Sequence, residues 1–388
     1  IYAQELIERS KFARNPPNNF AMRASAQFNR IAFLGTIGFN LSSAVVNSSQ
    51  IPLMFQPILG GKYGQDKSIK AIGQAMRLWG GSGLGAKIKV PFTNMGMQIG
   101  KKDARILTTP TGETVTAGGM PSIDNYYVLD DKGNYSIRTD IELDADKRAM
   151  LQSLIPLVKT AADRGQLNRS LFYDTLTLEE GGRVRSFWDK MNAVSAFFFH
   201  QQEKLNRQVA LISTYNLELD RMNTNPKGNE RNLTLEQKQE LAANEALYRA
   251  QEMNGGAALA NAPRIAQIPV GRVALMYKSY GIQMYYTLAK TFNRAVLNQK
   301  EFTPEEVKIA QKQFMGMLLS SAILAGIQGM PLVGLVVAVM NFARDDEEEP
   351  IEIIANRQLG EFLWKGPTSW FLQTDVSSRV GLSDLLFR

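Results

Sequence analysis

The sequence has no cysteine and a single histidine, His200, among 388 residues. Without cysteine the chain cannot form a disulfide or a thiolate metal site. One histidine cannot supply a histidine-rich metal cluster, and no motif marks a serine or a carboxylate as its partner in general-base catalysis. We therefore expect no metal, no cofactor and a non-catalytic role for His200.

Charged side chains are missing from two stretches of 31 residues each, residues 31–61 and residues 313–343. The first stretch is the more polar one, and Asn40 is a candidate N-cap for a short helix that ends near Pro52. The second stretch is strongly apolar and is soon followed by the acidic run of residues 345–349. Because burying one large apolar side chain gains about 1.5–3 kcal/mol, residues 313–343 are expected to face a core, a partner subunit or a bilayer.

Gly329 and Pro331 divide the apolar stretch into two predicted helices, residues 314–328 and residues 332–343. At 1.5 Å per residue these helices measure about 22 Å and about 18 Å. Neither alone crosses a hydrocarbon core of about 30 Å, whereas one kinked span made of both could do so. A buried helical hairpin in a soluble oligomer is an equal alternative.

Small residues recur at four-residue spacing in this stretch, Ala322 with Gly326 and Ala325 with Gly329. Such spacing lets helices pack closely, in membranes especially. The residues expected to face a membrane or a partner are Leu318, Leu319, Ile323, Ala325, Gly326, Gly329, Pro331, Leu335, Val336 and Val339.

The amino-terminal third of the chain is basic. Residues 1–110 hold 14 Lys and Arg against 4 Asp and Glu, a net charge of +10, whereas the remainder holds 30 against 33, a net charge of −3. A basic segment suits nucleic acid or an anionic membrane, and a solvated basic surface explains it equally well. The candidate contacts to double-stranded DNA are Lys87, Lys89, Lys101, Lys102 and Arg105.

Apolar residues recur at spacings of three and four through most of the chain, which predicts a mainly α protein built as a multi-helix assembly. A small glycine-rich insertion over about residues 80–140 interrupts this pattern, and its segments Tyr126–Leu129 and Tyr135–Arg138 flank a turn and predict a β-hairpin. The predicted segments are an amino-terminal helical segment (1–78), the β-containing insertion (79–141), a long-helix bundle (142–300), and an apolar helical hairpin with a carboxy-terminal tail (301–388).

The sequence also predicts where several helices begin and end. Residues 146–162 are predicted to form one helix, and the longest helix is predicted to run from near Ser186 to Met222. Capping-box patterns begin two further helices, at Thr234–Gln237 and at Thr303–Glu306. Another helix is expected over roughly residues 270–298.

No motif of enzyme chemistry is complete. Residues 81–86 fit the dinucleotide-binding glycine pattern by letter, but a helical pattern precedes them and an extended one follows, the reverse of the strand-to-helix context that this site needs. Lys87 does not directly follow the second glycine, as a phosphate-binding loop requires. Glu179 and Glu180 are adjacent and therefore point apart on a helix. We expect this part of the chain not to be an enzyme.

Aromatic and basic residues are interspersed over residues 272–294, a combination that can bind single-stranded nucleic acid. On a helix of this length, aromatic side chains more often form a core with a charged rim, and we favour this interpretation. The residues are Arg272, Tyr277, Lys278, Tyr280, Tyr285, Tyr286, Lys290, Phe292 and Arg294.

Several weak features occur together in one order along the chain, from about residue 20 to residue 388. Their key positions are Asn40, Asn47, Glu203, Arg207, Pro269, Arg272, Asp375, Ser377, Arg379 and Gly381. This ensemble resembles the carboxy-terminal region of very large bacteriophage proteins, the polyvalent or internal virion (DNA ejection) proteins with a Pro-Leu-x-Arg-Phe-Gly motif. Pro269 and Arg272 match that motif, whereas Val270, Val273 and Ala274 depart from it.

The resemblance implies a non-catalytic structural module that is packaged in the virion interior and helps to form a conduit for the genome across the host cell envelope. It implies as partners other virion proteins, the portal, further copies of the chain, double-stranded DNA bound without sequence preference, and the host membrane. A chain without cysteine avoids redox chemistry between cytoplasm and periplasm, and a basic third can lie against packaged DNA.

The sequence begins Ile1-Tyr2-Ala3, without an initiator methionine or a signal peptide, so we expect it to be a piece of a longer chain. Any enzymatic domain of that parent would lie elsewhere in it.

Three alternatives remain open. The first is a purely structural virion scaffold that never touches lipid. The second is a nucleic-acid-binding or scaffold region of a large virion-packaged polymerase or polyvalent protein. The third is an enzyme of unrecognised type, which would need His200, Glu179 and Glu180 to converge in a pocket.

Overall fold

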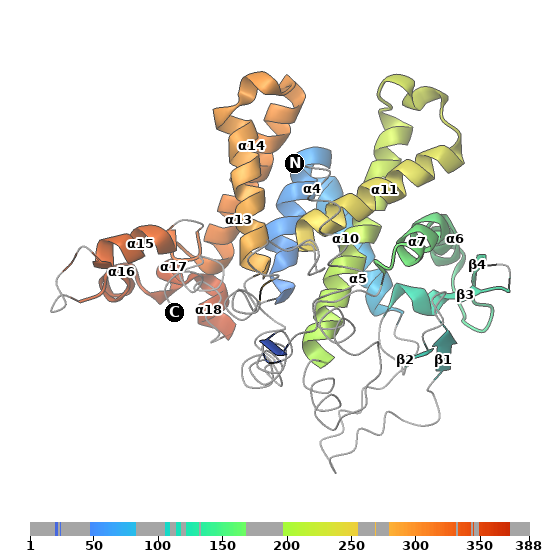
Figure 1. Ribbon diagram of the computed structural model, residues 1–388, viewed down its shortest axis with the longest axis horizontal. Coiled ribbons are helices and arrows are strands. Elements are labelled where there is room, and N and C mark those ends of the chain that lie inside the picture. Colours follow the sequence, from blue (N-terminus) through green and yellow to red (C-terminus); the bar gives the residue numbers. More distant parts are fainter. Residues whose placement is uncertain are drawn as a thin grey trace, which may run out of the picture. The chain divides into compact units, whose positions relative to one another are not determined.

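The computed structural model describes residues 20–21, 24, 47–82, 105–108, 114–117, 122–131, 133–167, 197–254, 268, 279–330, 333–342, 344 and 349–372. These residues are mainly helical, with two small two-stranded antiparallel sheets (Figure 1), which confirms the predicted mainly α class with a small β-containing insertion.

The chain divides into two compact units, and each unit combines stretches that are far apart in the sequence. Unit 1 comprises Ile1–Asp66, Ser170–Glu203 and Gln251–Arg388, and unit 2 comprises Lys67–Arg169 and Lys204–Ala250. The units therefore group the chain differently from the four consecutive segments of the sequence prediction.

The centre of unit 1 is the contact between α4 (Gln56–Tyr63) and α14 (Pro304–Ala325). The α4 helix continues a π-helical turn, η1 (Ile51–Phe55), and the apolar side chains of both are largely buried. Gly61 permits a close approach of α4 and α14, because a Cβ there would collide with the Gln313 side chain. The buried Gln313 amide donates to the Ile58 carbonyl oxygen at 2.8 Å, so this polar group enters the core with a partner.

The prediction that a helix ends near Pro52 is wrong, because helical structure continues through Pro52 into α4. Pro52 occupies the first turn of η1, where a missing N–H group is tolerated. The Gln56 N–H group then donates to the Ile51 carbonyl oxygen across a wide π turn, and the chain passes directly into α4. Asn40, the predicted N-cap, lies outside the described residues.

A helical hairpin forms the middle of unit 1. The helix α13 (Ser279–Phe292) leads through η6 (Asn293–Leu297) and η7 (Gln299–Glu301) into α14, which lies beside it (Figure 1). The predicted capping box at the start of α14 is confirmed. The Glu306 N–H group donates to Thr303 Oγ1 at 3.3 Å, and the Thr303 N–H group donates to Glu306 Oε2 at 2.9 Å. Of the helix predicted over residues 270–298, α13 and η6 cover residues 279–297. Residues 270–278 lie outside the described residues.

Among the described residues, four short helices follow α14: α15 (Val333–Phe342), α16 (Ile351–Leu359), α17 (Glu361–Trp364) and α18 (Gly366–Leu372). The α14 helix ends at Ala325, three residues before the predicted end, because Gly326 adopts a φ of +67°. The next two N–H groups then leave the helical pattern. Ile327 donates to the Leu363 carbonyl oxygen at 3.1 Å, and Gln328 donates to the Trp364 carbonyl oxygen at 2.9 Å.

The helices of unit 2 are largely α5 (Gln65–Gly80), α6 (Ala145–Ser153), α7 (Ile155–Asp163), α10 (Phe197–Thr224) and α11 (Leu235–Asn254). Its short elements are β1 (Arg105–Thr108), β2 (Thr114–Ala117), η2 (Ile123–Tyr126), β3 (Tyr127–Leu129), β4 (Tyr135–Ile137) and η3 (Gly228–Asn232).

The hairpin predicted from the sequence is confirmed as β3 and β4, with Tyr127 opposite Ile137 and Leu129 opposite Tyr135. Asp130 closes the turn, since its Oδ1 accepts a hydrogen bond of 2.7 Å from the Asn134 N–H group. The predicted capping box at Thr234–Gln237 is confirmed as well, at the start of α11.

The single helix predicted over residues 146–162 is wrong, because the chain forms two helices, α6 and α7, separated at Leu154. Pro156 explains the break, since it has no N–H group to donate to the carbonyl of the preceding turn. The longest helix, α10, ends at Thr224, close to the predicted Met222, and its predicted start near Ser186 lies outside the described residues.

Three buried tyrosines tie the helix ends of unit 2 together. The hydroxyl groups of Tyr126, Tyr127 and Tyr215 donate to the carbonyl oxygens of Leu78, Leu151 and Ser153 at 3.0, 2.8 and 2.9 Å. These carbonyls belong to the last turns of α5 and α6, where the regular hydrogen-bond pattern of the helix ends. Burial raises the pKa of Tyr127 and of Tyr215, so both hydroxyl groups remain donors at neutral pH.

We expect Gly326→Ala to destabilise unit 1 more than Gly360→Ala. Both glycines end helices with positive φ values, +67° and +78°, so both substitutions carry a conformational cost of about 1–3 kcal/mol. A Cβ on Gly326 would additionally lie 2.5 Å from the Trp364 carbonyl oxygen, whereas a Cβ on Gly360 would meet no atom within 4 Å. Urea unfolding followed by circular dichroism measures the difference, and equal effects of the two substitutions would contradict the close backbone contact.

Candidate functional site

Among the described residues, no helix combines the length and the hydropathy of a membrane span. The same residues bring together no group of three or more histidine, aspartate or glutamate side chains that could hold a metal ion. Three other features of these residues are candidates for a role: a small cavity, a cluster of ion pairs and an exposed apolar surface.

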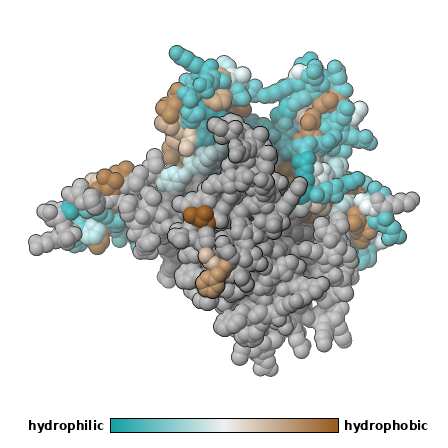
Figure 2. Space-filling view, viewed as in Figure 1, coloured by the Kyte–Doolittle hydropathy of each residue, from teal (hydrophilic) through white to brown (hydrophobic). Residues whose placement is uncertain are grey.

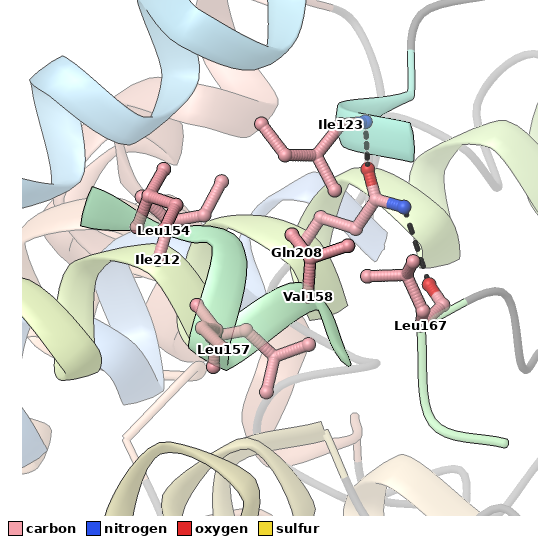
Figure 3. Close-up of a pocket in the computed structure, with 8 residues that line it drawn as sticks. Ile123, Leu154, Leu157, Val158, Leu167, Gln208 and Ile212 are labelled. Carbon is pink, nitrogen blue, oxygen red and sulfur yellow. Dashed lines mark hydrogen bonds between the residues drawn. The ribbon is translucent and has the colours of Figure 1, made fainter. Parts of the chain in front are cut away.

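The cavity lies in unit 2 and has a volume of about 10 Å³ (Figure 3). Its lining is apolar except for Gln208, and consists of Ile123, Leu154, Leu157, Val158, Leu167, Gln208, Leu211 and Ile212. This volume holds about one water molecule, so a substrate of ordinary size does not fit.

Gln208 has hydrogen-bond partners on both sides of its amide. Its Oε1 accepts from the Ile123 N–H group at 2.9 Å, and its Nε2 donates to the Leu167 carbonyl oxygen at 3.2 Å and to Ser122 Oγ at 3.0 Å. The side chain comes from α10 and joins η2 to the segment that follows α7 (Figure 3). Gln208 is completely buried, so we interpret it as a structural clasp between three segments of unit 2.

We expect Gln208→Leu to lower the free energy of unfolding by about 2–4 kcal/mol, because the Ile123 N–H and Leu167 carbonyl groups would remain buried without partners. Gln152→Leu, at an exposed position of α6, is the control and should change stability by less than about 0.5 kcal/mol. Urea unfolding measures both. A Gln208→Leu protein as stable as the control would show that the clasp is dispensable.

The ion-pair cluster holds the connection between α10 and α11. Arg221 contacts Glu230 through two hydrogen bonds of 2.9 and 2.7 Å and also contacts Glu218 at 2.8 Å. These bonds fix η3 against the end of α10. Hydrogen bonding to Arg221 lowers the pKa of Glu230, and the same contact raises the pKa of Arg221. The carboxylates are satisfied by a structural partner, which argues against a role as catalytic acid or base.

The stabilisation from Glu230 should be lost in acid. Because the folded-state pKa of Glu230 lies below its ordinary value of 4.5, the ion pair contributes fully above pH 4.5 and weakens as the pH falls further. We expect Glu230→Gln to lower the free energy of unfolding by about 1–2 kcal/mol at pH 7 and by progressively less below pH 4.5. Unfolding measured from pH 3 to pH 7 tests this, with Glu240→Gln, an exposed site on α11, as the control. A difference that stays constant with pH would contradict the assignment.

The exposed apolar surface is in unit 1 and begins on α14. Along the outer face of this helix, exposed Lys308 and Lys312 are followed by Met315, Leu319 and Ile323, whose exposed fractions are 52%, 56% and 65%. Their spacing of three or four residues places all five on one side of the helix. We call Met315, Leu319 and Ile323 the α14 stripe. The opposite side of the helix is buried, at Ala310, Gln313, Met317, Ser321 and Ala325.

The neighbouring helix adds further exposed apolar side chains. Tyr286, Phe292 and Val296 of α13 and η6 are more than a third exposed. The rings of Phe292 and Phe314 lie 5.5 Å apart, and Phe314 directly precedes Met315 of the α14 stripe. This aromatic pair joins α13 to α14, and Figure 2 shows hydrophobic side chains on the visible face of this hairpin.

Helices α15, α17 and α18 carry a second exposed apolar group. Val336, Val339 and Met340 are exposed on α15. On α17 and α18 the ring of Trp370 lies 6.0 Å from that of Phe362 and 4.7 Å from that of Phe371, and all three side chains are about half exposed or more. Exposed apolar groups of this extent are typical of surfaces that bind a partner.

The structure exposes some of the predicted membrane- or partner-facing residues and buries others. Leu319, Ile323, Val336 and Val339 are exposed, and Leu318 is half-buried. Three of the small residues, Ala325, Gly326 and Gly329, are buried, and Gly326 packs against the backbone of Trp364. Leu335 lies in α15, and Pro331 lies outside the described residues. Sequence reasoning missed Met315 and the aromatic group of α17 and α18, although the four-residue spacing of Met315, Leu319 and Ile323 is visible in the sequence.

Few of the predicted DNA contacts and family positions are among the described residues. Lys87, Lys89, Lys101, Lys102, Asn40, Pro269, Arg272, Asp375, Ser377, Arg379 and Gly381, together with Glu179 and Glu180, lie outside the described residues. Arg105 begins β1, and His200 lies in α10. Asn47 and Arg207 are buried and Glu203 is half-buried. In the predicted aromatic and basic cluster, Lys290 pairs with Glu252 at 2.6 Å and Arg294 lies over the Phe302 ring.

Comparisons of the chain with family models, with curated proteins and with solved structures found no match. Of the three candidate features, the exposed apolar surface of unit 1 is the one suited to binding a partner.

Proposed function

We propose that this chain is a non-catalytic structural module of a bacteriophage internal virion protein, which assembles through its apolar helix faces and takes part in genome delivery. The resemblance of the sequence to internal virion proteins supports the phage origin. The observation that carries the assembly role is the α14 stripe, because three large apolar side chains lie exposed on a helix whose other face is already packed.

Energetics support a covered state for this surface. Burying a large apolar side chain gains about 1.5–3 kcal/mol, so a stripe of three such residues favours contact with another surface over contact with water. The exposed residues of α13 and of α15 to α18 extend the same tendency over most of the carboxy-terminal part of unit 1. A protein stored at high concentration inside a capsid meets such surfaces on its neighbours.

The described polar groups support a structural role for unit 2. Gln208, Arg221 and the buried tyrosines each connect helices or helix ends, and the cavity beside Gln208 has room for about one water molecule. In the proposal, unit 1 supplies the assembly surface and unit 2 supplies a rigid helical body. Contact of residues 1–110 with packaged DNA is part of the proposal, resting on their net charge of +10.

The proposal predicts where the protein is found. Mass spectrometry of purified, DNA-filled particles of the encoding phage should detect peptides of this chain, and particles emptied by triggered ejection should lose most of them. The major capsid protein serves as the control, since its amount should not change on ejection. Peptides found only in infected-cell lysate, and never in purified particles, would overturn the proposal.

A further inference from the structure

We infer that the α14 stripe binds the same stripe on a second copy of the chain, with the two α14 helices antiparallel and Leu319 at the centre. The inference rests on the proposed function, since it names the partner and the surface of assembly. It commits to an isologous contact, in which one patch on each copy is used twice.

The spacing of the stripe suits a helix pair. Met315, Leu319 and Ile323 follow one another at four-residue intervals, so they form a ridge of the kind that packs into the groove of a facing helix. In an antiparallel pair centred on Leu319, Leu319 faces itself and Met315 faces Ile323 of the second copy. Residues 313–343 carry no charge, so this apolar contact brings no charged side chain of either α14 into its centre.

Charge complementarity selects the antiparallel direction. The same register places Lys312 of one copy beside the last turn of α14 in the other, where Ile323 and Ile327 are exposed although Gly326 itself is buried. The carboxy-terminal end of a helix carries a partial negative charge, so a lysine is favourable there. A parallel pair would instead place Lys312 against Lys312 and Lys308 against Lys308. Both lysines are exposed on the outer face, and their repulsion disfavours that arrangement.

The absence of cysteine from the natural sequence makes cross-linking a clean test. A single Leu319→Cys substitution should form a disulfide-linked dimer under mild oxidation. Met315→Cys and Ile323→Cys should each cross-link poorly alone and efficiently when mixed. We expect Leu319→Cys to cross-link on the order of ten-fold more than Lys159→Cys, an exposed position of unit 2, because paired helices raise the effective concentration of the thiols.

A second test does not depend on disulfides. Leu319→Glu should weaken dimerisation on the order of 100-fold in sedimentation equilibrium, because it sets two like charges against each other at the centre of the contact. Leu319→Met is the matched control and should leave the dimer intact. Leu319 is more than half exposed in the single chain, so the monomer should keep its circular dichroism spectrum and thermal stability.

Several results would overturn the inference. Efficient cross-linking of Met315→Cys to itself would show a parallel pair. Cross-linking of Leu319→Cys no greater than that of Lys159→Cys would show that the stripe does not pair. A monomer that floats with phosphatidylethanolamine–phosphatidylglycerol vesicles, and loses this binding in Leu319→Glu, would assign the stripe to lipid instead. None of these results bears on whether mass spectrometry detects the chain in purified particles. If the chain is found in particles but its stripes do not pair, only the pairing is refuted. If the stripes pair but the chain is absent from particles, only the phage role is refuted.

Discussion

The fold depends on satisfying the backbone groups that are left free where helices end. Proline and glycine divide this chain into many short helices, and each break leaves carbonyl and N–H groups that cannot be buried without a partner. The structure meets this need with buried polar side chains and with backbone contacts. Tyr126 and Tyr127 donate to the last turns of α5 and α6, Gln208 joins η2 to the segment after α7, and the chain after Gly326 donates to the end of α17. The polar groups of the core thus determine which helix ends can meet.

Features that depend on neighbouring residues could be predicted from the sequence. Thr303 and Glu306 form their capping box, and Asp130 closes the hairpin turn, because each acts within a few residues of its partner. The effect of a proline depends on more than its presence, and here the predictions failed. Pro156 separates α6 from α7, whereas Pro52 lies within continuous helical structure because a wide turn accommodates it. Gln208 shows no pattern in the sequence, since its partners lie more than 40 residues away.

The apolar stretch illustrates how far the candidate site could be predicted. Its exceptional hydropathy pointed to α14 and α15, and Leu319 and Ile323 are exposed on α14. Its small residues were expected to allow helices to cross closely, yet Gly326 ends α14 and contacts the backbone near Gly366. Burial on one side of α14 is set by α4, and the sequence contains no local pattern that pairs two helices so far apart. Which side of α14 is exposed can therefore be predicted only once its contact with α4 is known.

The pairing of α4 with α14 also has a consequence for synthesis. The η1 and α4 helices are largely apolar and buried, and Ile58 reaches its partner Gln313 across a separation of 255 residues. At translation rates of about 5–20 residues per second, the ribosome needs roughly 10–50 s to proceed from the end of α4 to the start of α14. During that interval the apolar side chains of η1 and α4 lack the α14 contact that buries them in the folded protein. To avoid aggregation during synthesis, this apolar segment therefore has to be covered by a chaperone or by another part of the nascent chain.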